Sequence, residues 1–330
     1  MRKELLFAIV AGGLFGLVIA FGIWRINSAL SPRKGASSQT QSEKPSDASI
    51  SIAKPSQNDV VGTSPVAISG ITKPNARVVV SGEGKDYFTL ADAKGTFSQE
   101  VALIGGVNEL VVIAFDDKGV AGSVSTNIIY STEFAKPQST PEPTTEASTD
   151  SIRQKVQEKV NEALNSPTAY LGTVTDIAES SIQLKSASGE IQQVGTQDNP
   201  SVIKDGKTPK TVKLTDIAIG DYIIAMGFKN GNHVITAQRI LITTPASPSQ
   251  RTAIEGAITD TGKNSLSIET LGKESLSATV DANTVVYRLE QDKFTKIKFS
   301  SLGEGNLIVA AGVGPQGKLL ARTIFYLKSE

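Results

Sequence analysis

Gly220-Asp221-Tyr222-Ile223-Ile224-Ala225-Met226-Gly227 occurs a second time in altered form, as Gly305-Asn306-Leu307-Ile308-Val309-Ala310-Ala311-Gly312. Three further blocks match in the same order at an offset of about 85 residues: Gly172–Asp176 with Gly256–Asp260, Ser181–Leu184 with Ser265–Ile268, and Ala237–Ile240 with Ala321–Ile324. Four matched blocks in one order indicate that a structural unit has been duplicated.

Each copy is too short for a full β-sandwich. Five or six short strands fit into about 75 residues, and a closed sheet removes exposed strand edges at that length. We therefore expect two small β-barrels of the oligonucleotide/oligosaccharide-binding (OB) or SH3-like kind, at residues 167–243 and 252–330, with a linker at 244–251. The order of the blocks resembles small exported β-barrel domains of unknown function in bacterial envelope proteins. Asn306 replaces Asp221 in the second copy, which puts a shared acidic role in doubt.

The matched aliphatic pairs are predicted to fill the barrels. They are Ile182 with Leu266, Ile224 with Val309, and Ile240 with Ile324. The copies differ most between the matched blocks, in residues 195–211 and 281–298, where loops would carry recognition.

Residues 49–132 show a different pattern, in which seven or so short apolar strands alternate with turn signals about every ten residues. This pattern predicts an antiparallel β-sandwich. It contains Gly70-x-Thr72-x-Pro74-x-Ala76-x-Val78, Asp92-x-x-Gly95-x-Phe97, Leu103-x-x-Gly106-x-Asn108 and Asp116-x-x-Gly119. These motifs resemble the bacterial immunoglobulin-like modules of surface proteins and of glucodextranase-B-like chains. The resemblance implies a spacer or adhesive module.

Polar segments separate these units. Residues 27–48 and the Pro/Thr/Ser-rich residues 133–150 cannot bury enough apolar surface to offset chain entropy, and both are predicted to be linkers. Residues 151–166 are predicted to form an amphipathic helix with one apolar stripe at Ile152, Val156, Val160 and Leu164. The stripe fits a cap on the following domain, and a self-associating helix is the alternative.

Leu5 to Trp24 are twenty consecutive residues without a charge, long enough as a helix to span about 30 Å of hydrocarbon. We expect residues 1–26 to be a short cytoplasmic tip and a retained transmembrane anchor, although a cleaved signal peptide is the rival interpretation. The predicted location is the cell membrane, with a single pass, a cytoplasmic N-terminus and extracellular C-terminal domains.

The composition excludes several classes of function. Lys and Arg together equal Asp and Glu at 33 each, so no basic excess exists for a nucleic-acid partner. The absence of cysteine excludes disulfides and thiolate metal sites, and the single histidine, His233, excludes a multi-histidine metal cage. Oligomeric state stays open.

Candidate chemical groups are few. Five aspartates in the first β domain invite a calcium interpretation, which we weigh against turn chemistry and find weaker: Asp59, Asp86, Asp92, Asp116 and Asp117. Asp176 and Asp260 fall at matching repeat positions, as a structural role would place them, and His233 is expected to be solvated. We predict no catalytic, cofactor-binding or metal-binding residues.

Three functions fit the sequence. The first is a non-catalytic surface protein with spacer, adhesion or binding modules, whose partner would be a cell-wall glycan or a surface protein. The second is a polysaccharide-binding ancillary protein, and the third is a carboxylate-based hydrolase.

Overall fold

The computed structural model describes residues 50–119, 121–135, 166–230, 232–247, 250–290, 293–315 and 317–327. The predicted anchor at 5–24, the linker at 27–48 and the helix at 151–165 lie outside these residues. Within them, no helix has the length and apolar character needed to cross a membrane. The described residues belong to one compact unit and are mainly β.

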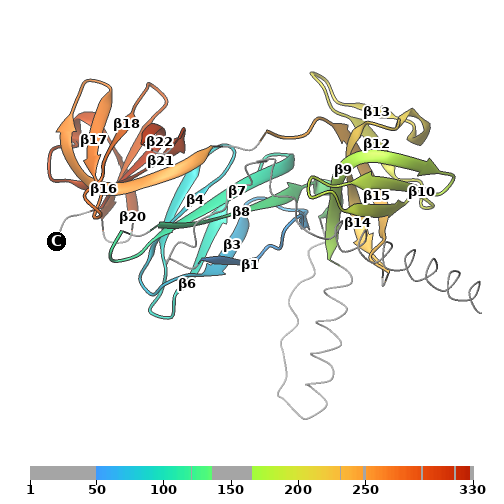
Figure 1. Ribbon diagram of the computed structural model, residues 1–330, viewed down its shortest axis with the longest axis horizontal. Helices are drawn as coiled ribbons and strands as arrows, with labels where there is room; N and C mark the ends of the chain where they lie inside the picture. Colours follow the sequence, from blue (N-terminus) through green and yellow to red (C-terminus); the bar gives the residue numbers. More distant parts are fainter. Residues whose placement is uncertain are drawn as a thin grey trace, which may run out of the picture. The chain divides into compact units, whose positions relative to one another are not determined.

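The described part of residues 50–135, here called the sandwich, forms two layers whose strands pair antiparallel except for the parallel pair β2–β8 (Figure 1). One layer has the order β1-β3-β6 and the other β2-β8-β7-β4-β5. The strands are β1 (Ser51–Lys54), β2 (Val60–Val61), β3 (Val66–Ile71), β4 (Arg77–Ser81), β5 (Asp86–Leu90), β6 (Thr96–Val101), β7 (Gly106–Phe115) and β8 (Ala121–Tyr130). Ile68 and Phe97 of the smaller layer pack on Val78, Leu110 and Ile128 of the larger one.

The chain stays packed just after the last strand of the sandwich. A short 3₁₀ helix, η1 (Thr132–Phe134), follows β8, and Phe134 is buried. Phe134, the second residue of the predicted linker 133–150, is therefore packed, because an aromatic side chain stabilises the turn by burying its ring.

The larger layer is buried on both faces. Residues 110–115 of β7 are all buried, although the strand alternation of a two-layer sandwich would expose every second one. Leu110, Val112 and Ala114 face the sandwich core, whereas Val111 and Ile113 belong to a second apolar cluster that includes residues beyond 300. The sheet therefore has a covered outer face.

The duplicated segments form two further sheets, the first repeat (residues 166–243) and the second repeat (residues 251–327), drawn in green to gold and in orange to red in Figure 1. The first has β9 (Pro167–Ala178), β10 (Ser181–Lys185), β11 (Ile191–Gly195), β12 (Ser201–Lys204), β13 (Lys210–Val212), β14 (Tyr222–Lys229) and β15 (Ile235–Thr243). The second has β16 (Arg251–Thr261), β17 (Ser265–Glu269), β18 (Ser275–Thr279), β19 (Val285–Glu290), β20 (Lys293–Ile297), β21 (Leu307–Val313) and β22 (Lys318–Leu327).

Both repeats have the same topology, as the duplication predicted. The first has the order β11-β10-β9-β14-β15-β12-β13, and β11 also pairs with β15, so that five strands close into a ring. The second repeats this order as β18-β17-β16-β21-β22-β19-β20, closed by β18 and β22. Each copy has seven strands and not the five or six expected, because the segments predicted as variable loops contain the hairpins β12–β13 and β19–β20.

The matched glycines have a common cause. Each pair of central strands contains a β-bulge, immediately before Gly227 in one repeat and before Gly312 in the other. A Cβ atom at either glycine would lie 2.0 Å from a backbone oxygen of the partner strand, that of Thr236 or of Leu320. Only glycine allows this close approach.

The exchange of Asp221 for Asn306 is also explained. The Asp221 carboxylate accepts a hydrogen bond from the Ala218 amide (2.9 Å), and the Asn306 side-chain oxygen accepts one from the Gly303 amide (3.0 Å). Both side chains close the same turn, so the residue is needed as an acceptor and its charge is dispensable.

One core assignment from the sequence is wrong. Ile224 and Val309 were predicted to fill the barrels, but both point out of their own repeat and pack against the sandwich. Ile223 and Ile308 fill the two cores instead. In each strand the two adjacent residues, Ile223 and Ile224 or Ile308 and Val309, are both aliphatic. The sequence pattern therefore did not determine which of the two faces inward.

Candidate functional site

Both repeats pack an equivalent face on the outer face of the larger sandwich layer. In the first repeat, the outward residues of the central strands meet Val60, Ile129 and Phe134. In the second repeat, they meet Val79, Phe88, Val111, Ile113 and Phe115. The strand register shows that the two faces are equivalent. Leu171 lies opposite Ile224 in the first repeat, and at the same positions of the second repeat Glu255 lies opposite Val309.

The second repeat contributes an aromatic cluster to its contact. The Phe88 ring of the sandwich lies 5.6 Å from Phe294 and 5.4 Å from Phe325, measured between ring centroids. Tyr287 stacks on Phe325 at 6.1 Å. Such pairs stabilise a contact by about 0.5–1.5 kcal/mol each beyond the area they bury.

Arg322 joins the second repeat to the sandwich through a dense set of hydrogen bonds. It is the bulged residue of β22, and its guanidinium enters the turn between β4 and β5. There it donates to both carboxylate oxygens of Asp86, to the Ser81 hydroxyl (3.1 Å), and to the carbonyls of Gly82 (3.0 Å) and Glu83 (3.1 Å). The Asp86 side chain is fully buried, so Arg322 is its compensating charge.

A second buried acid lies in the same contact. Glu255 is buried, and one of its carboxylate oxygens lies 2.7 Å from the Arg77 Nε. The angles fall outside hydrogen-bond geometry, so the attraction is mainly between charges. Burial raises the pKa of Glu255, Arg77 opposes the shift, and Asp116 adds to it.

The first repeat makes a less polar contact. Ala169, Ile224 and Met226 pack on the sandwich, and the Ala169 amide donates to the Asn58 carbonyl at 2.9 Å. The one ion pair recorded here among the described residues joins Arg239 to Glu133, whose side chain is 46% exposed. Exposed pairs of this kind contribute about 0–1 kcal/mol.

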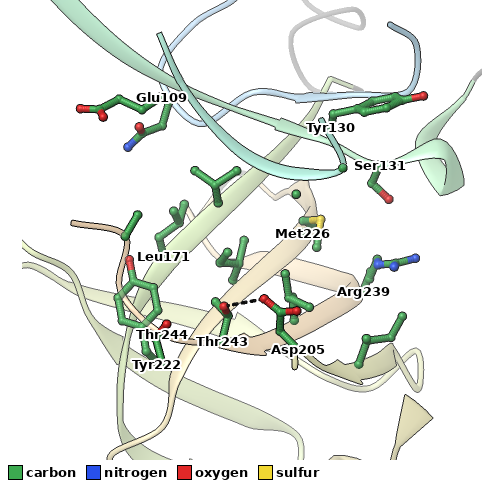
Figure 2. A pocket seen from close by; sticks show the side chains of 18 of the residues that line it. Glu109, Tyr130, Ser131, Leu171, Asp205, Tyr222, Met226, Arg239, Thr243 and Thr244 are labelled. Atoms are coloured by element: carbon green, nitrogen blue, oxygen red, sulfur yellow. Dashed lines mark hydrogen bonds between the residues drawn. The ribbon is translucent and has the colours of Figure 1, made fainter. Parts of the chain in front are cut away.

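This contact leaves an open groove of about 650 Å³ between the sandwich and the first repeat, here called the groove (Figure 2). Its apolar lining comes from Val107, Leu171, Ile224, Met226 and Leu241. Figure 2 shows Glu109, Tyr130 and Ser131 on the sandwich side and Tyr222, Asp205 and Thr243 on the side of the first repeat.

The polar groups of the groove have distinct environments. The Asp205 carboxylate accepts a hydrogen bond from the Thr243 hydroxyl at 3.1 Å and one from the Gly206 amide at 2.8 Å. Burial raises the pKa of Tyr222 above its ordinary value. Within the described residues its hydroxyl has no hydrogen-bond partner, so it is available to a ligand.

A smaller cavity of about 520 Å³ lies beside the second repeat. Its lining includes Lys85, Asp281, Asn283, Tyr287 and Arg322. The loops predicted to carry recognition therefore contribute to both cavities, because Ile203 and Asp205 line the groove and Asp281 and Tyr287 line the smaller cavity. The sandwich residues of the groove had no signal in the sequence.

Four of the five aspartates considered for calcium have structural roles, and the role of Asp86 beside Arg322 is described above. Asp92 accepts hydrogen bonds from the amides of Lys94 and Thr96, both at 2.8 Å, and Asp59 accepts one from the Ser56 amide at 2.7 Å. Asp116 pairs with Lys73 at 2.7 Å. No group of three acidic or histidine side chains that could hold a metal ion occurs within the described ranges.

The remaining candidates are dispersed. His233 is exposed with a φ of 59°, and its carbonyl accepts a hydrogen bond from the Tyr170 hydroxyl. Asp176 and Asp260 are exposed on strands of different repeats, next to equivalent bulges.

No protein family and no curated protein matches this chain. Among solved structures, a carbohydrate acetylesterase from Xanthomonas citri is 28% identical over 23% of this chain, which spans 17% of the esterase chain, with a TM-score of 0.19. A calcium-stabilised adhesin with which an Antarctic bacterium binds ice is 17% identical over 85% of this chain and 74% of its own (TM-score 0.20). A Bacteroides ovatus protein of the mixed-linkage glucan utilization locus, solved with a heptasaccharide, is 13% identical over 85% and 70% (TM-score 0.20). At these TM-scores the similarities decide neither fold nor function.

Proposed function

We propose that this chain is a non-catalytic, membrane-anchored bacterial surface protein that binds a ligand in the groove. The groove carries the proposal, since its volume of about 650 Å³ lies in the range of roughly 300–1,000 Å³ that ligand sites occupy. An apolar floor with a few polar groups is also typical of such sites. The apolar run from Leu5 to Trp24 supports anchoring, with the N-terminus in the cytoplasm and the β domains outside.

Binding fits the groove better than catalysis. The Asp205 carboxylate is engaged by Thr243 and by its own turn, so it serves as a positioned acceptor. Tyr222 is half-buried with a raised pKa, and it therefore stays a neutral hydrogen-bond donor across physiological pH. The sandwich would then act as an immunoglobulin-like spacer, and each repeat as a small barrel.

A neutral glycan is the ligand class that these groups favour. Tyr130 and Tyr222 offer aromatic faces for the C–H surfaces of a sugar ring, and Asn127 and Asp205 offer groups that hydrogen-bond hydroxyls. The residue types at the rim of the groove are the support for a neutral glycan as the ligand class.

A glycan array with the full chain in mild detergent tests both parts. We expect binding that Tyr222→Ala weakens by at least about tenfold, as the loss of one well-packed aromatic contact predicts. Asp198→Asn, at an exposed acid outside the groove lining, is the matched control for Asp205→Asn. Absence of binding to every glycan would reject the glycan class, and binding that both groove variants leave intact would reject the groove.

A further inference from the structure

The residues with which the first repeat lines the groove have counterparts in the second repeat. Strand β12 pairs with β15 in the same register as β19 pairs with β22, and the hairpins β12–β13 and β19–β20 also match. Three groove residues thereby correspond to three aromatic residues, the last pair by extending the hairpin register one residue: Ile203 to Tyr287, Leu241 to Phe325, and Pro209 to Phe294. The groove is therefore lined by the part of the repeat that forms the aromatic cluster in the second copy.

In the second repeat, this part of the fold holds one ring of the sandwich. The buried Phe88 ring lies 5.6 Å from the Phe294 ring and 5.4 Å from the Phe325 ring, measured between centroids. In the first repeat, the corresponding Pro209 and Leu241 border the open groove of about 650 Å³. The second repeat thus shows, within the same chain, which group fits this face of the fold: an apolar six-membered ring.

Polar residues of the groove replace leucines of the second repeat. These leucines belong to the apolar cluster around Phe88. The register gives three such exchanges: Asp205 for Leu289, Tyr222 for Leu307, and Thr243 for Leu327. In the first repeat the Asp205 carboxylate accepts a hydrogen bond from the Thr243 hydroxyl at 3.1 Å, and Figure 2 shows this pair at the groove. The first repeat therefore places hydrogen-bonding groups beside the apolar place where the second repeat holds a ring.

Exposure to water is another reason for polar residues at these positions, and it requires no ligand. It does not account for Ile203 and Leu241, which stay aliphatic and half-buried in the same lining. The experiment must therefore separate a ring-binding place from a surface that is merely solvated.

We propose that the groove binds an aromatic ring at the place that corresponds to Phe88, and that this ring is a substituent of the glycan. The inference rests on the glycan-binding function proposed above. Ile203, Pro209 and Leu241 contact the ring, and the carboxylate of Asp205 accepts hydrogen bonds from sugar hydroxyls next to it. The ligand class is thereby narrowed from a neutral glycan to a glycan that carries an aryl group.

The test compares matched glycosides by calorimetry, using the full chain in lipid nanodiscs because detergent tails would compete for an apolar place. The probes are the para-nitrophenyl and methyl glycosides of glucose, galactose, mannose and N-acetylglucosamine, together with benzyl alcohol, which carries the ring without the sugar. Burial of one aromatic ring predicts that the aryl glycoside of a bound sugar binds about 10- to 100-fold more tightly than its methyl glycoside.

Ile203→Tyr installs the residue of the second repeat and fills the proposed place with the protein's own ring. It should lower the aryl preference to less than about threefold and leave the affinity for the methyl glycoside within about twofold. Ile203→Ala, which removes a contact without adding volume, should lower the preference by about threefold or more. The matched control is Ile177→Tyr, at an exposed isoleucine outside the groove lining, and it should change the preference less than about twofold.

Equal affinities for aryl and methyl glycosides would overturn the inference and leave glycan binding intact. An aryl preference that both Ile203 variants leave unchanged would do the same, because the ring would then bind elsewhere. Binding of benzyl alcohol that depends on Ile203, without binding of any glycoside, would keep the ring site and reject the glycan. Binding of none of these probes would reject both the ring site and the glycan.

Discussion

The two repeats share one backbone design and dock on the same sheet, but they dock through different chemistry. At the position where the first repeat has Leu171, the second has the buried acid Glu255, and the bulged residue is Gln238 in one and Arg322 in the other. The second repeat is joined by desolvated charges and aromatic rings. The first is joined mainly by aliphatic contacts that leave the groove open.

This difference separates what the duplication preserved from what it changed. Bulge glycines, turn acceptors and inward aliphatics are alike in both copies because each sheet needs them to close. The outward face of the same strands is free to vary, so it determines how each copy meets the sandwich. One copy attaches to the sandwich through buried charges and aromatic rings, and the other borders the groove.

Arg322→Ala should show the largest effect. The variant leaves the buried Asp86 carboxylate without its cation, which costs about 3–5 kcal/mol of folding free energy. Gln238→Ala, the equivalent substitution in the first repeat, removes an exposed side chain and should stay within about 0.5 kcal/mol. Chemical denaturation measures both, and similar losses would contradict the assigned asymmetry.

Ile223→Ala and Ile224→Ala should have unlike effects although they are neighbours. Ile223 lies in the core of the first repeat, so its truncation should cost about 2–5 kcal/mol and raise hydrogen exchange throughout that repeat. Ile224 packs on the sandwich, so its truncation should raise exchange where the two meet and leave β10 and β11 protected. Hydrogen exchange detected by mass spectrometry resolves the two patterns. Uniform loss of protection in both variants would contradict this assignment and would place Ile224 in the core of the first repeat.

Glu255 should make stability depend weakly on pH. Its folded-state pKa is raised by burial, so the folded state binds a proton more readily than the unfolded state. The stability that this tighter proton binding gives the folded state is fully present below the ordinary glutamate pKa of 4.5. It is lost as the pH rises through the raised folded-state pKa. Glu255→Leu, which installs the residue type of the first repeat, should remove this fall in stability. Denaturation at pH 4 to 8 compares the slopes, and an unchanged slope would assign the dependence to other groups, such as Asp59.

Sequence reasoning predicted the parts of this structure that depend on local signals. The duplication, the turn role of Asp92 and the strands of the sandwich follow from spacing and turn chemistry. Ile203 and Asp205, in the segment 195–211 where recognition was predicted, line the groove, and their role in recognition stays a prediction.

Contacts between distant segments could not be predicted in this way. Asp86 and Arg322 are 236 residues apart, and neither has a neighbour in sequence that signals the other. The unbroken apolar run of residues 110–115 was the one available signal that the sheet is covered on both faces, because a half-exposed strand alternates. This apolar run indicates that a second layer covers the sheet, but it does not identify which part of the chain forms that layer.

Two double-mutant cycles in the same protein test the central asymmetry most directly. One cycle combines Asp86→Ala with Arg322→Ala, and the other combines Glu133→Ala with Arg239→Ala, the ion pair of the first repeat. We predict a coupling energy of about 2–3 kcal/mol for the buried pair and less than about 1 kcal/mol for the exposed pair. Equal coupling energies in the two cycles would contradict the conclusion that the repeats dock by different chemistry.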